Sequence, residues 1–149
     1  MKKIILSMAL AIAILGSAFA TPANYEPSVI VKEAFAKEFC GVKEVQWDKM
    51  CGESVYEAKF TFNNETLQAY FSVEGEFLGT MRLISAARLP VLAANELAKE
   101  YPNAHIVSIY EHSMPDALAY YITVTTEKGG LVLKATGSGD LTVYKRYRG

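Results

Sequence analysis

The residue types that most often carry out chemistry are few in this sequence, and they lie far apart. Its two histidines, His105 and His112, are separated by seven positions. An odd separation on a continuous strand directs two side chains to opposite faces, and a tetrahedral metal site needs further nitrogen, sulfur or oxygen ligands. We therefore predict no metal site and interpret both histidines as surface or turn residues.

The other polar residues favour structural roles. Asp48, Asp116 and Asp140 all lie in or beside expected turns, where aspartate is favoured because its side chain bonds the local backbone. No serine stands in a G-x-S-x-G motif, and no helix follows Gly137-Ser138-Gly139 to complete a phosphate loop. Without a nucleophile–base pair or a ligand set, the sequence predicts a protein that is not an enzyme and holds no cofactor.

Cys40 and Cys51 could form a disulfide, depending on the segment between them. Export to an oxidising compartment would permit the bond. However, Cys40 closes the first expected helix, and Cys51 follows a strand whose ends lie about 20 Å apart at about 3.3 Å per residue. A disulfide needs Cα atoms within about 7 Å. The spacing disfavours the bond, and a curled strand would restore it.

Residues 1–20 have the pattern of a secretory signal. Lys2 and Lys3 precede an apolar run from Ile4 to Leu15, and small residues at Ala18 and Ala20 form an A-x-A cleavage site. The apolar run is too short for a spanning helix, which needs about 20 residues. We expect an exported, periplasmic or secreted protein with no membrane span after cleavage.

The mature chain, Thr21 to Gly149, has the length of one domain with a single hydrophobic core. Removing residues 1–20 takes away two lysines and no acids, so the formal net charge changes from −1 to −3. Nucleic-acid binders show a strongly basic domain, and the basic cluster Lys145-Arg146-Tyr147-Arg148 is short and terminal. We therefore expect no nucleic-acid partner.

After a flexible leader at 21–26, the pattern predicts one helix followed by four strands. Pro27 opens a helix with Val31, Phe35 and Phe39 on one face, and Gly41 ends it. Alternating apolar runs then follow at 44–48, 56–63, 67–73 and 77–83, separated by turns at 63–64 and 74–76. Such alternation indicates antiparallel strands with one buried face.

The same unit then returns. Ala98-Lys99-Glu100-Tyr101 repeats Ala36-Lys37-Glu38-Phe39 at an offset of 62 residues, and Val107 and Ile109 match Val45 and Trp47. The next hairpin is two residues longer, so Gly139-Asp140-Leu141 matches Gly75-Glu76-Phe77 at an offset of 64. We interpret the chain as a tandem repeat, with units at about 27–88 and 89–147 inside one domain, 27–149.

Each unit is too small to cover four strands alone, so the two units must join. This predicts an α+β fold: an antiparallel sheet of up to eight strands with two helices on one face. The alternate strand positions then form an open face. Of these we select as candidate binding residues Lys59, Tyr70, Arg82, Tyr110, Tyr121, Lys134, Tyr144 and Arg146, with Glu57, Thr61, Gln68, Thr80 and Thr123 beside them.

The residue types of this face allow two interpretations. Tyrosine and arginine are enriched at protein-binding surfaces, whereas threonine, tyrosine and lysine are also ordinary strand formers on a solvated sheet. A one-residue shift in register would exchange the faces, so single assignments depend on the register.

Several short motifs carry a resemblance to a known family. They are Val45-Gln46-Trp47, Tyr56-Glu57-Ala58-Lys59-Phe60, the turn Glu74-Gly75-Glu76, Leu89-Pro90 before the second helix, and Tyr120-Tyr121-x-Thr-Val. With the signal peptide, this pattern resembles the PepSY-like periplasmic proteins. Their fold is similar to that of the beta-lactamase inhibitor protein (BLIP), a tandem repeat with helices on one side of a concave eight-stranded sheet. The resemblance implies a non-catalytic, exported binding or inhibitor-like module.

Two functions follow as hypotheses. In the first, the open face binds an extracytoplasmic protein or peptide. In the second, a crevice between the repeats binds a small molecule or a cell-wall fragment, which requires a pocket of a few hundred Å³ with convergent polar groups.

Overall fold

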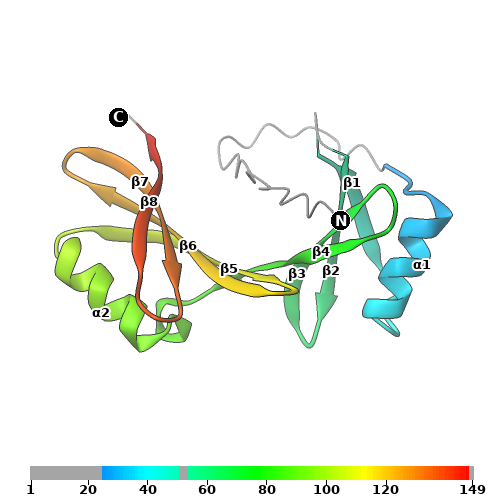
Figure 1. Cartoon of the computed structure of the whole chain (residues 1–149), viewed down its shortest axis with the longest axis horizontal. Coiled ribbons are helices and arrows are strands. Elements are labelled where there is room, and N and C mark those ends of the chain that lie inside the picture. The colour runs from blue at the N-terminus through cyan, green and yellow to red at the C-terminus, as the bar shows by residue number, and fades with distance from the viewer. Residues whose placement is uncertain (1–24, 51–53, 148–149) are drawn as a thin grey trace, which may run out of the picture.

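One helix followed by four strands occurs twice along the chain (Figure 1). The structure is a computed structural model and describes residues 25–50 and 54–147; the expected signal peptide, most of the leader and Cys51 lie outside these ranges. The elements are α1 (Val29–Glu38), β1 (Val45–Lys49), β2 (Val55–Phe62), β3 (Glu65–Ser72), β4 (Phe77–Ile84), a 3-10 turn η1 (Ala86–Arg88), α2 (Val91–Glu100), β5 (His105–Met114), β6 (Ala117–Thr126), β7 (Gly129–Thr136) and β8 (Leu141–Tyr147).

The eight strands form one antiparallel sheet in the order β1 to β8, so each strand pairs with its neighbours in sequence. The turn between β2 and β3 is tight because Asn63 and Asn64 both adopt positive φ, 50° and 63°. The two halves, residues 25–88 and 89–147, join where β4 pairs with β5. The predicted α+β fold with an eight-stranded antiparallel sheet is confirmed.

Both helices lie on the same side of the sheet, at its opposite ends (Figure 1). Thr80 in β4 pairs with Ala69, which belongs to the core under α1. Ile84, four residues further along the same strand, belongs to the core under α2. Residues four apart on a strand share a face. We call this side the helix face and the other side the open face.

The core under α1 is rich in aromatic rings. Val31 and Phe35 of the helix are buried there. Phe35 meets Phe60 edge to face at 5.0 Å between ring centroids, and meets Trp47 at 5.4 Å. Edge-to-face contacts of this kind add about 0.5–1.5 kcal/mol each beyond the area that they bury.

The core under α2 is mostly aliphatic and separate from the first. Ala93 and Leu97 of α2 are buried there with Ile109, Ile122 and Leu133 of the strands. The expectation of a single core was wrong. A ten-residue helix is about 15 Å long, whereas eight strands about 4.8 Å apart span more than 30 Å, so each helix covers only its own half.

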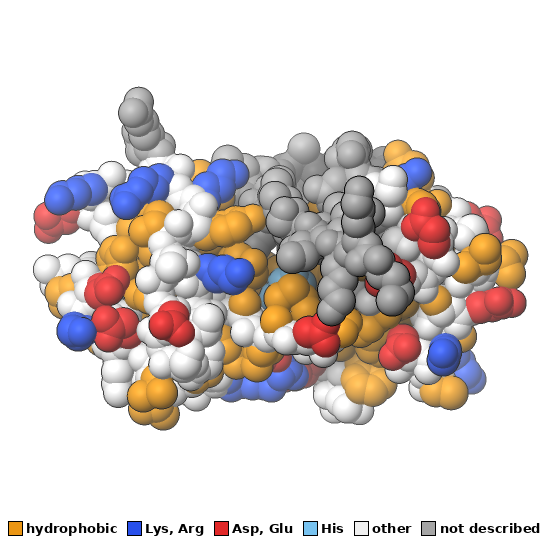
Figure 2. Space-filling view, in the orientation of Figure 1, with side chains coloured by type: hydrophobic (Ala, Val, Ile, Leu, Met, Phe, Trp, Pro, Cys, Tyr) orange, Lys and Arg blue, Asp and Glu red, His pale blue; other side chains and the backbone are white. Residues whose placement is uncertain are grey.

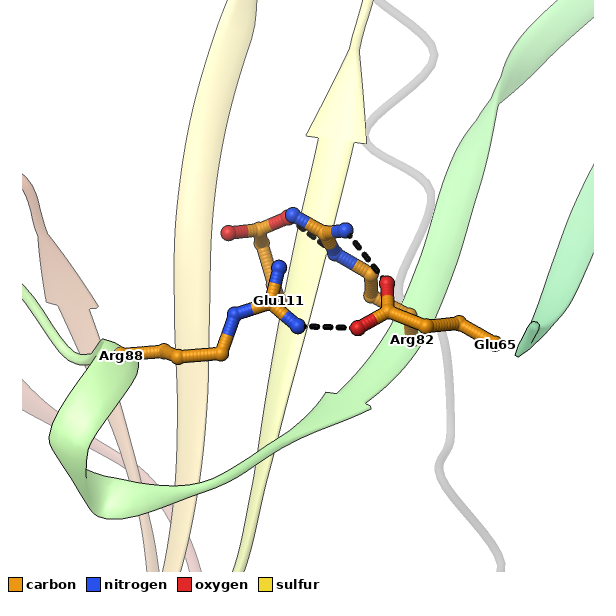
Figure 3. Close-up of polar contacts among 4 residues, drawn as sticks. All are labelled: Glu65, Arg82, Arg88 and Glu111. Carbon is orange, nitrogen blue, oxygen red and sulfur yellow. Dashed lines mark hydrogen bonds and ion pairs between the residues drawn. The ribbon is translucent and has the colours of Figure 1, made fainter. Parts of the chain in front are cut away.

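Ion pairs occupy the helix face between the two cores (Figure 3). Arg82 on β4 donates to Glu111 on β5 at 2.7 Å and to Glu65 on β3 at 2.8 Å. Arg88 in η1 also pairs with Glu65 and holds the pKa of that carboxyl below its usual range. Because Glu111 belongs to the second half, the group ties the two halves together.

A close glycine contact recurs in both halves. A Cβ on Gly75, in the turn between β3 and β4, would lie 2.8 Å from Cγ2 of Ile30 at the start of α1. A Cβ on Gly139, in the turn between β7 and β8, would lie 3.1 Å from Cβ of Leu92 at the start of α2. Both glycines also have positive φ. Each helix therefore begins directly against a turn that only glycine fits.

Candidate interaction surface on the open face

An irregularity between β3 and β4 decides which residues of β4 reach the open face. Tyr70 pairs with Gly79 but its neighbour Phe71 pairs with Phe77, so one residue of β4 is left over. The bulge reverses the alternation that the sequence predicted. Met81 and Leu83 point to the open face, whereas Thr80 and Arg82 point to the helix face. The placement of Thr80 and Arg82 on the open face was therefore wrong.

A second bulge lies at Val107 in β5. Ile106 pairs with Val124 and Ser108 pairs with Thr123, which leaves Val107 unpaired and 58% exposed. The repeat matched Val107 to Val45, which packs against the core under α1, and the expectation of an equivalent place for Val107 was therefore wrong. The extra residue also places His105 and His112 on the same face, contrary to their odd spacing.

A third bulge lies in β8. Lys145 pairs with Val132 and Val143 pairs with Leu133, so Tyr144 is the extra residue. Its ring turns to the open face and meets Tyr121. Beyond the bulge, Arg146 pairs with Leu131, a member of the core under α2. Arg146 therefore lies on the helix face, and its placement on the open face was wrong.

The remaining candidates do lie together on the open face, in rows that the strand register defines. One row runs across Lys59, Gln68, Met81, His112, Ala119 and Thr136. The next row runs across Thr61, Thr66, Leu83, Tyr110, Tyr121, Lys134 and Thr142. A third contains Glu57 and Tyr70. The two halves contribute to every complete row.

A hydrophobic cluster on this face crosses the junction of the halves. Its buried members are Val55, Tyr70, Met81, Ala119, Tyr121 and Val132. All of these residues belong to strands, so the cluster forms without a helix. Figure 2 shows Lys and Arg side chains gathered over β7 and β8, with hydrophobic side chains between them and the centre of the molecule.

Tyr121 is the centre of the aromatic contacts on the open face. Its ring lies 5.1 Å from that of Tyr144, edge to face, and 6.1 Å from that of His112. Tyr110 stands directly opposite Tyr121 on β5, and Lys134 stands opposite it on β7. Aromatic rings and a lysine thus share one small area.

The buried phenols on this face stay protonated. Burial, and then the charge of Glu57, raise the pKa of Tyr70, whose hydroxyl approaches Sδ of Met81 at 3.9 Å. Burial and the neighbouring Tyr144 raise the pKa of Tyr121. At neutral pH both phenols therefore offer hydrogen-bond donors beside a large apolar area.

His112 is the most unusual side chain of the open face, and its interpretation as a surface or turn residue was wrong. Only 4% of it is exposed, and within the described part of the chain neither ring nitrogen has a hydrogen-bond partner. Burial lowers its pKa, and the charge of Lys134 lowers it further. His112 is two residues beyond Tyr110 on a regular stretch of β5, so the alternation that places Tyr110 on this face places His112 there too, whereas its burial depends on neighbouring strands.

Two hollows lie at the ends of the halves. One, of about 610 Å³, lies beyond α2 and is lined by Tyr101, Leu131 and Arg146 among others. The other, of about 940 Å³, lies beyond α1 beside Cys40, Val45 and Lys59. Neither is the crevice between the repeats that the small-molecule hypothesis required, so that hypothesis gains no support from them.

Two sequence predictions concern metal ligands and the cysteines. Across residues 25–50 and 54–147 no three His, Cys, Asp or Glu side chains come together as a group that could hold a metal ion. Cys40 is exposed just after α1, and its suggested partner Cys51 lies outside the described residues.

Comparison with solved structures identifies the fold. A BLIP-like protein from Bacteroides fragilis superposes with a TM-score of 0.73 at 17% identity, covering 85% of this chain and 91% of that one. A DUF2874 family protein from Bacteroides ovatus gives a TM-score of 0.72 at 21% identity, covering 83% and 92%. A candidate periplasmic protein from Bacteroides eggerthii gives 0.71 at 15% identity, covering 83% and 90%.

These likenesses define a class of fold, the BLIP-like α+β sheet, and they are too distant in sequence to define more. No protein-family model and no curated protein matches the sequence. None of the three names above is PepSY, so that part of the resemblance stays a prediction. Among the described residues, no helix has the length and apolar character needed to cross a membrane.

Proposed function

We propose that this chain is an exported, non-catalytic binding module that holds a protein or peptide on its open face. The observation that carries the proposal is the hydrophobic cluster around Tyr70, Met81 and Tyr121, which lies on the side that no described helix covers. Buried apolar residues usually lie beneath another element. Here they lie on an outer side of the sheet.

The chemistry of the face supports a protein or peptide ligand. Tyr110, Tyr121 and Tyr144 give large contact areas with few rotatable bonds, and residues of this type dominate the energy of protein interfaces. Lys59 and Lys134 lie at the border of the cluster, as polar side chains do around an interface core. The face therefore has an aromatic centre and a polar rim.

Export is part of the proposal. The lysines at the start, the apolar run from Ile4 to Leu15 and the small residues at Ala18 and Ala20 support a cleaved signal peptide. A structural neighbour described as a candidate periplasmic protein agrees with this location. We place the mature chain in the periplasm or outside the cell.

Affinity capture from an envelope extract tests the function. The bait is the mature chain, and the test variant carries Lys59→Ala, Leu83→Ala and Tyr144→Ala, three exposed positions of the open face. The matched control carries Val91→Ala, Leu92→Ala and Lys99→Ala, three exposed positions of α2. We expect a protein that the wild type and the control retain and the test variant loses. Retention by all three baits, or by none, would contradict the proposal.

A further inference from the structure

His112 carries an unmet hydrogen-bonding capacity. Nine-tenths or more of the side chain is buried, and neither Nδ1 nor Nε2 finds a partner in the described part of the chain. Leaving a buried polar group unsatisfied destabilises a fold, because the group has lost its hydrogen bonds to water. Buried polar atoms are nearly always paired, so an orphaned imidazole in a binding face suggests a group supplied from outside.

The neighbours of His112 show what that group would meet. Met81 on β4 and Ala119 on β6 stand on either side of it in the same row. The titratable groups that face it are Tyr110 on β5, Tyr121 on β6 and Lys134 on β7, with Tyr70 of β3 in the adjoining cluster. On β4 the titratable Arg82 points to the other face.

The charged side chains on the open face of the second half are positive. Within β5–β8, the open-face positions include Lys134 and Lys145 but no carboxylate, because Glu111 lies on the helix face and the other described acids of this half lie in turns or on α2. In the first half, Glu57 lies beside Tyr70 and forms a hydrogen bond with Gln68. An anionic group would therefore favour the area around His112 and Lys134.

We propose that the open face receives a carboxylate side chain from an acidic segment of its protein partner, between the imidazole of His112 and the ammonium of Lys134. The carboxylate would accept hydrogen bonds from both groups, which are charge-assisted and stronger than neutral ones. This inference rests on the proposed function and adds the chemistry of the partner.

The side chains beside His112 are flexible or small. Met81 and Met114 are unbranched and adapt their shape easily, and Ala119, directly opposite His112, is small. A ligand would reach the buried ring by displacing these flexible side chains.

Binding of a carboxylate should be coupled to proton uptake. The anion favours the charged imidazolium, so it raises the pKa of His112 in the complex above that in the free protein, where burial and Lys134 lower it. Affinity should consequently increase as the pH falls from 7.5 to 5.5, while the ligand carboxylate remains ionised.

Selection from a peptide library tests the inference directly, because it needs no identified partner. A displayed library of random 12-residue peptides is selected on the immobilised mature chain at pH 6. The most enriched peptide is then synthesised with its acidic residues intact and with each changed to the amide. Calorimetry measures the original peptide and each amide variant on the wild type, His112→Gln, Lys134→Gln and, as the control, Lys99→Gln on the exposed side of α2.

The inference predicts that the enriched peptide is acidic and that one amide substitution weakens its binding to the wild type and to Lys99→Gln by about tenfold, or about 1.4 kcal/mol. The same substitution should have under about threefold effect on Lys134→Gln, which keeps the test valid if His112→Gln does not fold. The test variant with Lys59→Ala, Leu83→Ala and Tyr144→Ala separates the two proposals. Peptides that no longer bind this variant, but whose binding to the wild type does not depend on their acidic residues, overturn this inference and leave the proposed function standing. Peptides that bind that variant normally, or no enrichment at all, overturn both.

Discussion

Tyr121 and Tyr144 meet edge to face across two strands, with their ring centroids 5.1 Å apart. Tyr144 is two residues beyond Thr142, which pairs with Lys134 on the open face, so the regular alternation of β8 already directs its ring to this face. The bulge at Tyr144 acts on the residues that follow it, and turns Arg146 to the helix face. The aromatic centre of the open face thus joins β6 to the edge strand β8.

Tyr144→Ala should destabilise the fold modestly and remove binding. The edge-to-face contact with Tyr121 contributes about 0.5–1.5 kcal/mol to the free energy of unfolding, which urea denaturation would measure. Tyr144→Phe keeps the ring and should keep most of that stability. A loss of stability in the Phe variant equal to that in the Ala variant would show that the ring contact is not the cause.

Gly75→Ala should destabilise the fold more than Gly41→Ala. Both glycines have nearly the same positive φ, 86° and 87°, so a side chain costs about 1 kcal/mol of backbone strain at either position. Only at Gly75 would the added Cβ also meet Ile30, at 2.8 Å, whereas nothing lies within 4 Å at Gly41. Chemical denaturation measures the free energy of unfolding of both variants, and the difference between them is the cost of the contact with α1. Equal losses of stability in the two variants would contradict this prediction.

Glu111→Gln should lower the free energy of unfolding by about 1–2 kcal/mol, because it weakens a half-buried, charge-assisted hydrogen bond from Arg82. Glu96→Gln is the matched control, since its pair with Lys99 lies on the exposed side of α2 and should contribute little. Thermal and urea unfolding measure both. A loss of the same size in the two variants would mean that the group in Figure 3 does not hold the halves together.

The free protein should lose stability as the pH falls below about 6.5, the ordinary pKa of histidine. Because the folded state lowers the pKa of His112, the neutral imidazole stabilises the fold above this pH, and that contribution disappears as the pH falls through the lowered value. His112→Gln should remove this slope, and Lys134→Gln should reduce it. The measurement is the melting temperature from pH 7.5 to 5.0, a window above the range in which the carboxyl of Glu65 titrates.

Much of the architecture could be predicted from local patterns. Several features follow from residue chemistry that acts within a few positions: the start of α2 after Leu89-Pro90, the Asn63-Asn64 turn, and the alternation along β2, β3, β6 and β7. The first helix was expected to open at Pro27, and α1 begins two residues later with Ser28 as its N-cap. The order of elements follows from the same patterns. None of these features depends on contacts between distant parts of the chain.

The assignment of faces failed where a strand gains a residue. In β4 the sequence reads as alternation through Phe77, Gly79, Met81 and Leu83, yet the bulge near Gly79 moves the last two to the open face. Gly79 has a φ of 143°, and a Cβ there would lie 2.5 Å from the carbonyl oxygen of Ser113, a contact with a strand more than 30 residues away. Such a contact is set by the neighbouring strand and leaves no trace in the local hydrophobic period.

The candidate site was therefore predicted in part. Tyr70, Tyr110, Tyr121 and Lys134 lie on regular stretches and reach the open face as expected, whereas Arg82 and Arg146 follow bulges and do not. His112 lies on the same regular stretch as Tyr110, and its interpretation as a surface or turn residue failed because its burial comes from side chains of other strands.

Site-specific photo-crosslinking tests the central claim most directly. A benzophenone side chain is placed at Lys59 or Tyr144 on the open face, and at Val29 or Val91 on the exposed sides of the helices, in the exported chain within living cells. We predict that light produces the same adduct from both open-face positions, which come from different halves, and none from the helix positions. Adducts only from Val29 or Val91, or from neither pair, would contradict the assignment of the open face as the binding surface.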